Sequence, residues 1–157
     1  MQNNQLFYEV TCSSRRSLLG TPSSRGFLFP IECDRYLPNM IQMLKSKIHG
    51  VTATGADLEY EGSIAIDQSL MEMAGIIEFE KVAVWNKTNG NRHETYAIKA
   101  PPGSGEITVN GAASHLVKAG DELIIASFMY VDTKDVPHHK PTIVLITDKK
   151  KNKGHLK

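Results

Sequence analysis

The stretch Tyr60-Glu61-Gly62-Ser63-Ile64-Ala65-Ile66-Asp67 decides how the fold and the chemistry of this chain are understood. Taken alone, Gly62-Ser63 is a common turn dipeptide, and a turn is its ordinary structural role. The residues that follow, 67–75, begin with an acidic residue, continue with helix formers and end with a glycine. These start and stop signals predict one short helix.

Short segments rich in Val, Ile, Thr, Tyr and Phe lie on both sides of this helix, and turn residues separate them. Residues of these types favour β-strands, and several short strands joined by tight turns predict a small barrel or sandwich. The predicted fold is therefore mainly β with one or two short helices. The predicted strands are residues 47–54, 81–85, 94–98, 106–109 and 122–128.

The chain has 157 residues, enough for one ordinary domain. Residues 1–39 hold short apolar pieces among Ser, Thr and Arg without a sustained period, and they lack the continuous apolar run of a secretory signal. We predict a poorly structured N-terminal extension there, and a β domain over residues 40–148. Residues 149–157 are rich in lysine and are predicted to form a solvated, frayed tail.

Composition excludes several classes of partner. The 18 basic and 17 acidic residues leave a formal charge of +1, so no overall field attracts nucleic acid or an anionic membrane. The apolar runs are far shorter than the ~20 residues that span a bilayer. Both cysteines, Cys12 and Cys33, lie in the extension, which fits a cytoplasmic protein. The six histidines lack ligand spacing, so no metal site is predicted.

The common catalytic motifs, such as GxSxG, GxGxxG, a Walker loop and HExxH, are absent from the sequence. Three further segments follow residues 60–67 along the chain: Asn-Lys-Thr-Asn-Gly at 86–90, Thr-Tyr-Ala-Ile at 95–98 and Val-Asn-Gly-Ala-Ala at 109–113. In the order and the residues of these segments, the chain resembles the bacterial aspartate 1-decarboxylases from Met40 to about Met129. This resemblance implies a double-psi β-barrel that assembles as a homotetramer, with active sites between subunits.

The resemblance also implies a reaction. The Ser63 hydroxyl attacks the carbonyl of Gly62, the chain is cut there, and residue 63 becomes a covalent pyruvoyl group. A glycine before the serine suits this step, because it tolerates a strained backbone and a crowded intermediate. The amine of L-aspartate then condenses with the ketone as a Schiff base, and decarboxylation gives β-alanine for pantothenate and coenzyme A.

Other site residues follow from the same resemblance. Thr95 polarises the Gly62 carbonyl during cleavage and later contacts the substrate. Tyr96 is the proton donor, because a phenol stays protonated at neutral pH. Lys47 and Arg92 hold the two carboxylates of aspartate. The small residues that present backbone donors to the substrate are Gly111, Ala112 and Ala113, and the supporting residues are Asn110, Tyr60, His49 and Trp85.

Each of these residues also has an ordinary structural role. Thr95 and Tyr96 suit any strand, Asn110-Gly111 suits a type I′ hairpin turn, and a lone tryptophan such as Trp85 suits a core. After the serine stands Ile64, where the enterobacterial pattern has cysteine. This difference leaves the reaction unaffected, because the reaction uses the atoms of the serine.

Two alternative functions stay open at this stage. One is a β-barrel binding module that does not process itself, and the intact Gly62-Ser63 with Thr95 and Tyr96 argues against it. The other is a pyruvoyl decarboxylase of another amino acid, and the paired cations Lys47 and Arg92, which suit a dicarboxylate, argue against that. The sequence also leaves open whether a maturation factor assists the cleavage.

Overall fold

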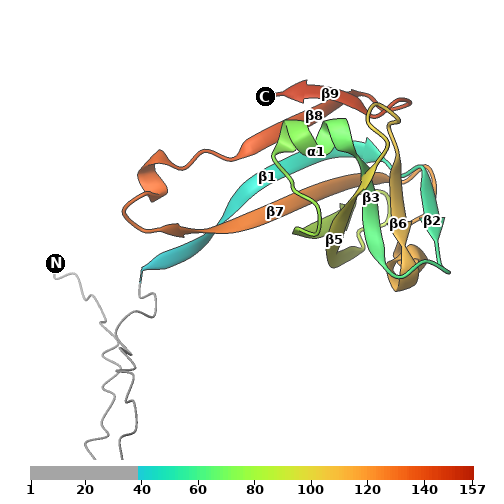
Figure 1. Ribbon diagram of the computed structural model, residues 1–157, viewed down its shortest axis with the longest axis horizontal. Helices are drawn as coiled ribbons and strands as arrows, with labels where there is room; N and C mark the ends of the chain where they lie inside the picture. Colours follow the sequence, from blue (N-terminus) through green and yellow to red (C-terminus); the bar gives the residue numbers. More distant parts are fainter. Residues whose placement is uncertain (1–38) are drawn as a thin grey trace, which may run out of the picture. The chain divides into compact units, whose positions relative to one another are not determined.

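Nine strands form a single mixed sheet in the computed structural model, which describes residues 39–157 (Figure 1). Of the predicted N-terminal extension, only Asn39 belongs to the described residues. Both cysteines lie outside them. The strands are β1 (Met40–Thr52), β2 (Gly55–Asp57), β3 (Ser63–Asp67), β4 (Lys81–Asn86), β5 (Arg92–Ala100), β6 (Ile107–Asn110), β7 (Glu122–Asp132), β8 (Thr142–Asp148) and β9 (Lys153–Leu156).

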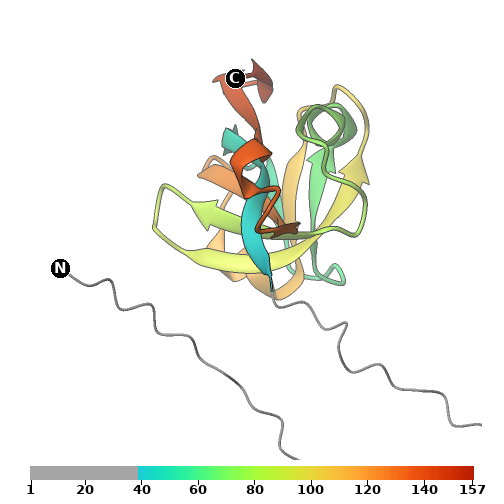
Figure 2. The same cartoon turned by 90° about the vertical axis from the view of Figure 1, so that its left-hand side faces the viewer.

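The order of the strands requires the sheet to curl. Neighbours run β2-β6-β3-β5-β4-β7-β1-β8-β9, so β1 and β2 lie six positions apart in the sheet, yet only Ala53 and Thr54 separate them in sequence. Ala53 N donates to Asp121 O (2.8 Å) before β7, and Thr54 N donates to Ile107 O (2.8 Å) in β6. Because the link is so short, the sheet turns round on itself, as the end view in Figure 2 shows.

The core fills the inside of this curled sheet. Ile48 on β1 pairs with Ile125 on β7, which pairs with Val84 on β4, and all three side chains are fully buried. Residues paired across strands point to the same face, and residues one position away point to the other. The alternate row on β1, β7, β4 and β5 therefore faces outward, and it carries several of the predicted site residues.

The helices are few and short. Helix α1 (Gln68–Ala74) follows β3 directly, with Asp67 as its N-cap and Gly75 (φ 66°) as its C-cap, so the prediction of a short helix at 67–75 is confirmed. Within residues 39–157 there are also two 3₁₀ segments, η2 (Gly111–Leu116) and η3 (Val136–His138). Among residues 39–157, none of the helices has the length and apolar character that crossing a bilayer requires.

The prediction of a frayed tail is wrong. Strand β9 pairs antiparallel with β8, and the turn between them carries Asn152, which is buried. Asn152 Nδ2 donates to Thr52 O (2.8 Å) and to Gly105 O (2.7 Å), and its Oδ1 accepts from Thr52 N (2.7 Å). The abundance of lysine concealed this role, because the lysine side chains are exposed while one asparagine anchors the turn.

We expect Asn152→Ala to lower the free energy of unfolding by about 2–4 kcal/mol, because it leaves Thr52 N, Thr52 O and Gly105 O without their partner. Denaturant unfolding measures this. The matched control is Lys150→Ala, which removes an exposed side chain from the same turn. Equal stability of the two variants would show that the tail is not part of the fold.

Candidate functional site

Ser63 is the first residue of β3 and is fully buried. Its register partner on β6 is Asn110, and Asn110 Nδ2 donates a hydrogen bond to Ser63 Oγ at 2.8 Å. Asn110 is also buried, so this bond lies out of contact with solvent. The pair fixes the position of the serine hydroxyl at the point where the chain enters the sheet.

Two glycines bring the backbone close to this hydroxyl. Gly62 has φ 75°, and its N donates to Tyr60 O (2.8 Å) in a tight three-residue turn. Gly111, with φ 68°, faces this turn so closely that a Cβ on it would lie 2.6 Å from Gly62 Cα. Both positions therefore require glycine, one for its backbone angle and the other for its angle and the contact.

Asn110-Gly111 is not a hairpin turn. Asn110 is extended (φ −110°), ends β6 and pairs with β3, whereas a type I′ turn needs a positive φ at both of its central residues. Gly111 then opens the 3₁₀ segment η2, which carries Ala112 and Ala113. The ordinary alternative for this dipeptide is thus wrong, and Asn110 instead contacts Ser63 directly.

Strand β5 carries Thr95 and Tyr96 on opposite faces. Thr95 pairs with buried Val82 of β4 and so faces inward, while Tyr96 pairs with exposed Lys81 and faces outward. On its other side β5 runs parallel to β3, with Ile64 opposite Ala97. If this register is extended back by one residue, Ser63 and Tyr96 lie level with each other on the face opposite to Ile64 and Ala97. The exposed fraction of Tyr96 is 39%.

The predicted carboxylate-binding residues form a second group on the outward face. His49, Ile124, Trp85 and Arg92 follow one another across β1, β7, β4 and β5, and Lys47 lies two residues before His49. The Arg92 guanidinium carbon lies 5.4 Å from the centroid of the Trp85 ring, in a cation–π contact. Arg92 is four residues from Tyr96 along β5, roughly 13 Å of strand. Lys47 lies on β1 and Ser63 on β3, with β5, β4 and β7 between these two strands in the sheet.

The surroundings of His49 lower the pKa of its imidazole. Burial lowers the pKa of its ring, and the nearby charges of Lys47, Lys87 and Lys149 lower it further, against the opposing influence of Glu122. Glu122 accepts hydrogen bonds from Lys87 Nζ and from Lys149 Nζ (2.8 Å for the latter). The group thus presents several cations around the imidazole of His49, a setting suited to an anionic ligand.

A hollow of about 320 Å³ opens beside the Ser63 group, by which we mean Ser63, Asn110, Tyr96 and the backbone of Gly62 and Gly111. Its wall includes Tyr60, Ala65 and Asn110, and Ala65 lies on the same face of β3 as Ser63. The hollow continues along β5 past Ile98 and Lys99. It is large enough for a small amino acid and reaches the asparagine that binds Ser63.

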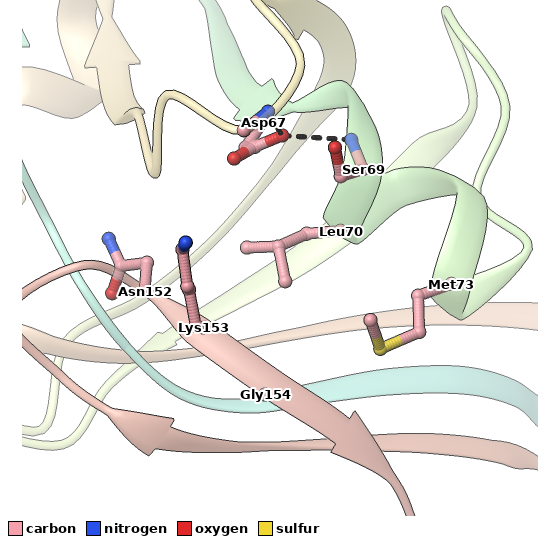
Figure 3. A pocket seen from close by; sticks show the side chains of 8 residues that line it. Asp67, Ser69, Leu70, Met73, Asn152, Lys153 and Gly154 are labelled. Atoms are coloured by element: carbon pink, nitrogen blue, oxygen red, sulfur yellow. Dashed lines mark hydrogen bonds between the residues drawn. The ribbon is translucent and has the colours of Figure 1, made fainter.

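A second hollow, of about 280 Å³, lies between α1 and β9 and contains none of the predicted site residues (Figure 3). Its carboxylate, that of Asp67, accepts hydrogen bonds from the backbone N–H groups of Ser69 (2.8 Å), Gly103 (2.9 Å) and Gly105 (2.7 Å). Burial works against ionisation, but these donors outweigh it and hold the pKa of Asp67 below its usual value. The carboxylate therefore fastens the start of α1 to the 101–105 loop.

Metal ligands do not converge in the described part of the chain. Residues 39–157 contain no group of three or more His, Cys, Asp or Glu side chains placed to hold a metal ion. The Ser63 group itself consists of a hydroxyl, a carboxamide, a phenol and glycine backbone.

Comparison with known proteins assigns the family. The model of the aspartate decarboxylase family matches residues 39–153, which include every residue of both groups described above. The chain belongs to the aspartate decarboxylase family. The aspartate 1-decarboxylase of Syntrophotalea carbinolica is 52% identical over 108 residues, which cover 69% of this chain and 82% of that protein.

Two other relatives of the family agree. The aspartate 1-decarboxylase of Myxococcus xanthus is 54% identical over 104 residues, covering 66% of this chain and 80% of that protein. The aspartate 1-decarboxylase of Hyphomonas neptunium is 50% identical over 107 residues, covering 68% of this chain and 91% of that protein. The resemblance predicted from the sequence is therefore confirmed, and the mainly β fold with few short helices agrees with it.

Proposed function

We propose that this chain is an aspartate 1-decarboxylase that cuts itself between Gly62 and Ser63, converts residue 63 to a pyruvoyl group and forms β-alanine from L-aspartate. The observation that carries the proposal is the buried Ser63 hydroxyl, bound by Asn110 directly after a positive-φ glycine, in a chain of this family. The use of β-alanine for pantothenate and coenzyme A follows from membership of the family.

The chain is cut by bonds that form and break at the Gly62-Ser63 junction. Ser63 Oγ attacks the Gly62 carbonyl carbon, the C–N bond breaks, and the hydroxyl proton passes to the nitrogen of residue 63. The ester that results loses the Cα proton of residue 63 and breaks its Cβ–O bond, which leaves a Gly62 carboxylate and dehydroalanine. Water then releases ammonia and leaves a ketone.

The neighbouring residues support this step. The bond from Asn110 Nδ2 holds Ser63 Oγ in place, and the contact with Gly111 fixes the Gly62 backbone. If the β3–β5 register is extended back by two residues, Gly62 lies level with Thr95. This agrees with the proposed role of the Thr95 hydroxyl, donation of a hydrogen bond to the Gly62 carbonyl oxygen as negative charge develops there.

Turnover uses the same face of the sheet. The ketone at residue 63 supplies an electron sink for loss of the α-carboxylate. Tyr96, on that face, donates its phenol proton to the substrate α-carbon after CO₂ leaves. Gly111, Ala112 and Ala113 leave room for the substrate and offer backbone N–H groups at the start of η2.

Lys47 and Arg92 are proposed to bind the two carboxylates of aspartate, with Trp85 and His49 beside them. Membership of the family implies active sites between subunits, so we propose that a second subunit brings a cation to the ketone. This favours a homotetramer of double-psi β-barrels with shared active sites. The closely spaced ends of the curled sheet agree with such a barrel.

The test of this proposal is intact mass under denaturing conditions. We expect a fragment that ends at Gly62 and one that starts at residue 63, the latter lighter by one ammonia than a fragment with N-terminal serine. Samples are warmed alone and with an extract of cells that process a relative, which tests for a maturation factor. A single full-length chain in both samples would refute the enzyme and favour a binding module.

Gly111→Ala should slow this cleavage by at least about tenfold. The added Cβ would meet Gly62 Cα at 2.6 Å and Gly62 N at 2.7 Å, so the scissile backbone must move, and small displacements of reacting groups are costly. The matched control is Gly90→Ala, which also places alanine at a positive φ (81°) but in open space. Equal cleavage rates in the two variants would contradict the role of the contact.

A further inference from the structure

Phe79 has a backbone conformation that phenylalanine disfavours. Its φ is 65°, and among residues 39–157 the only other non-glycine residue with a positive φ is Asn152. Asparagine tolerates this region, whereas a bulky residue there is strained. The Phe79 side chain is also 71% exposed in the single chain, so burial of the ring within its own subunit does not compensate for the strain.

The strain arises from a bulge against β5. Phe79 N donates to Ala97 O (2.8 Å), and Ala97 N donates to Glu80 O (3.0 Å), so Phe79 and Glu80 together oppose Ala97. In a bulge of this type the first residue is left-handed and is normally glycine. Phe79 thus occupies a position at which the backbone conformation favours glycine.

The bulge is anchored firmly from β1. Both carboxylate oxygens of Glu80 accept hydrogen bonds from Lys45 Nζ (2.7 and 2.8 Å), and one of them accepts a further bond from Ile77 N (3.0 Å). Glu80 N also donates to Ile77 O (3.2 Å), which closes the turn. The loop therefore holds Phe79 at a fixed place.

That place is beside Tyr96. The centroids of the Phe79 and Tyr96 rings lie 6.3 Å apart at an interplanar angle of 42°, within the range of favourable aromatic pairs. Tyr96 directly precedes Ala97, the residue that the bulge binds. The bulge thus restrains the backbone next to Tyr96, and the Phe79 ring restrains its side chain.

We propose that Phe79 is a positioning residue that orients the Tyr96 ring for proton transfer to the substrate. The inference rests on the role of Tyr96 in the proposed function. It explains why a bulky aromatic residue stands at a strained and exposed position, since its ring contacts the proton donor and contributes little buried surface.

The decisive variant is Phe79→Asn, which removes the ring and keeps a residue that accepts a positive φ. We expect its kcat for aspartate to fall by about 3- to 10-fold through loss of the aromatic contact. We expect the thermal unfolding temperature to rise by roughly 2–5 °C, because strain is relieved. Unfolding is measured with Ser63→Ala also present, so that every chain stays whole. Phe79→Tyr, which keeps the ring, should stay within about twofold of the parent kcat.

A double-mutant cycle with Tyr96→Phe completes the test. If Phe79 acts through Tyr96, Phe79→Asn has no further effect on kcat once the phenol is absent. Parental kcat in Phe79→Asn, or an equal loss in both backgrounds, would overturn the inference. Normal two-chain cleavage with parental kcat in Tyr96→Phe alone would instead refute the proposed role of Tyr96, so the two failures are distinguishable.

Discussion

Ser63→Ala is expected to give a single uncleaved chain with no measurable formation of β-alanine. The substitution removes one oxygen, which in the proposed reaction is both the nucleophile of the cleavage and the atom whose loss leads to the ketone. Without it neither the two-chain pattern nor the electron sink can form. The fold should persist, at a cost of about 1–3 kcal/mol, because buried Asn110 Nδ2 loses its acceptor.

Denaturing electrophoresis, intact mass and a β-alanine assay measure the outcome. The control is Ser104→Ala, which removes a hydroxyl from an exposed turn and should cleave at the parent rate. Cleavage between residues 62 and 63 in the Ser63→Ala protein would refute the role of Ser63, whatever its effect on activity.

Tyr96→Phe separates turnover from cleavage. Cleavage uses the Ser63 hydroxyl and donors near the Gly62 carbonyl, so the variant should still yield two chains. Turnover needs a positioned acid, and its loss typically costs ~10²- to 10⁴-fold in rate, so kcat for aspartate should fall by about that factor. Thr95→Ala, one residue away but on the other face, should instead slow the cleavage.

Steady-state formation of β-alanine, normalised to the fraction of cleaved chain, gives the relevant rate. Aspartate binding should persist in Tyr96→Phe, because Lys47 and Arg92 are unchanged. Turnover at the parent rate would mean that another group or water supplies the proton, and the assignment of Tyr96 would fall while that of Ser63 stands.

Local patterns predicted several elements well. Helix α1 was predicted from Asp67 and Gly75, because both caps act within a few residues. Strands β4, β5, β6 and β7 lie where Val, Ile, Thr and Tyr are dense. Strand β3 was not predicted, because it has only five residues and begins at Ser63 in a Gly-Ser dipeptide that is typical of a turn.

Features that depend on distant residues were not predictable. The bond between Ser63 and Asn110 joins residues 47 positions apart, and only the β3–β6 register brings them together. Asn152 joins residues 100 positions away at Thr52. The strain at Phe79 depends on a bulge against Ala97, which no local pattern indicates.

The position of the Gly62-Ser63 bond in the sheet governs how the cut protein behaves. The segment before the cut supplies β1, which lies between β7 and β8, and β2, which pairs with β6 at the edge of the sheet, so both of its strands pair with strands from beyond the cut. The two pieces cannot separate without breaking the sheet, so the cut protein should remain one particle in native solution. Once denatured, the two fragments must associate in order to refold. The yield of refolded protein should therefore depend on the concentration of the fragments because the chain has been cut.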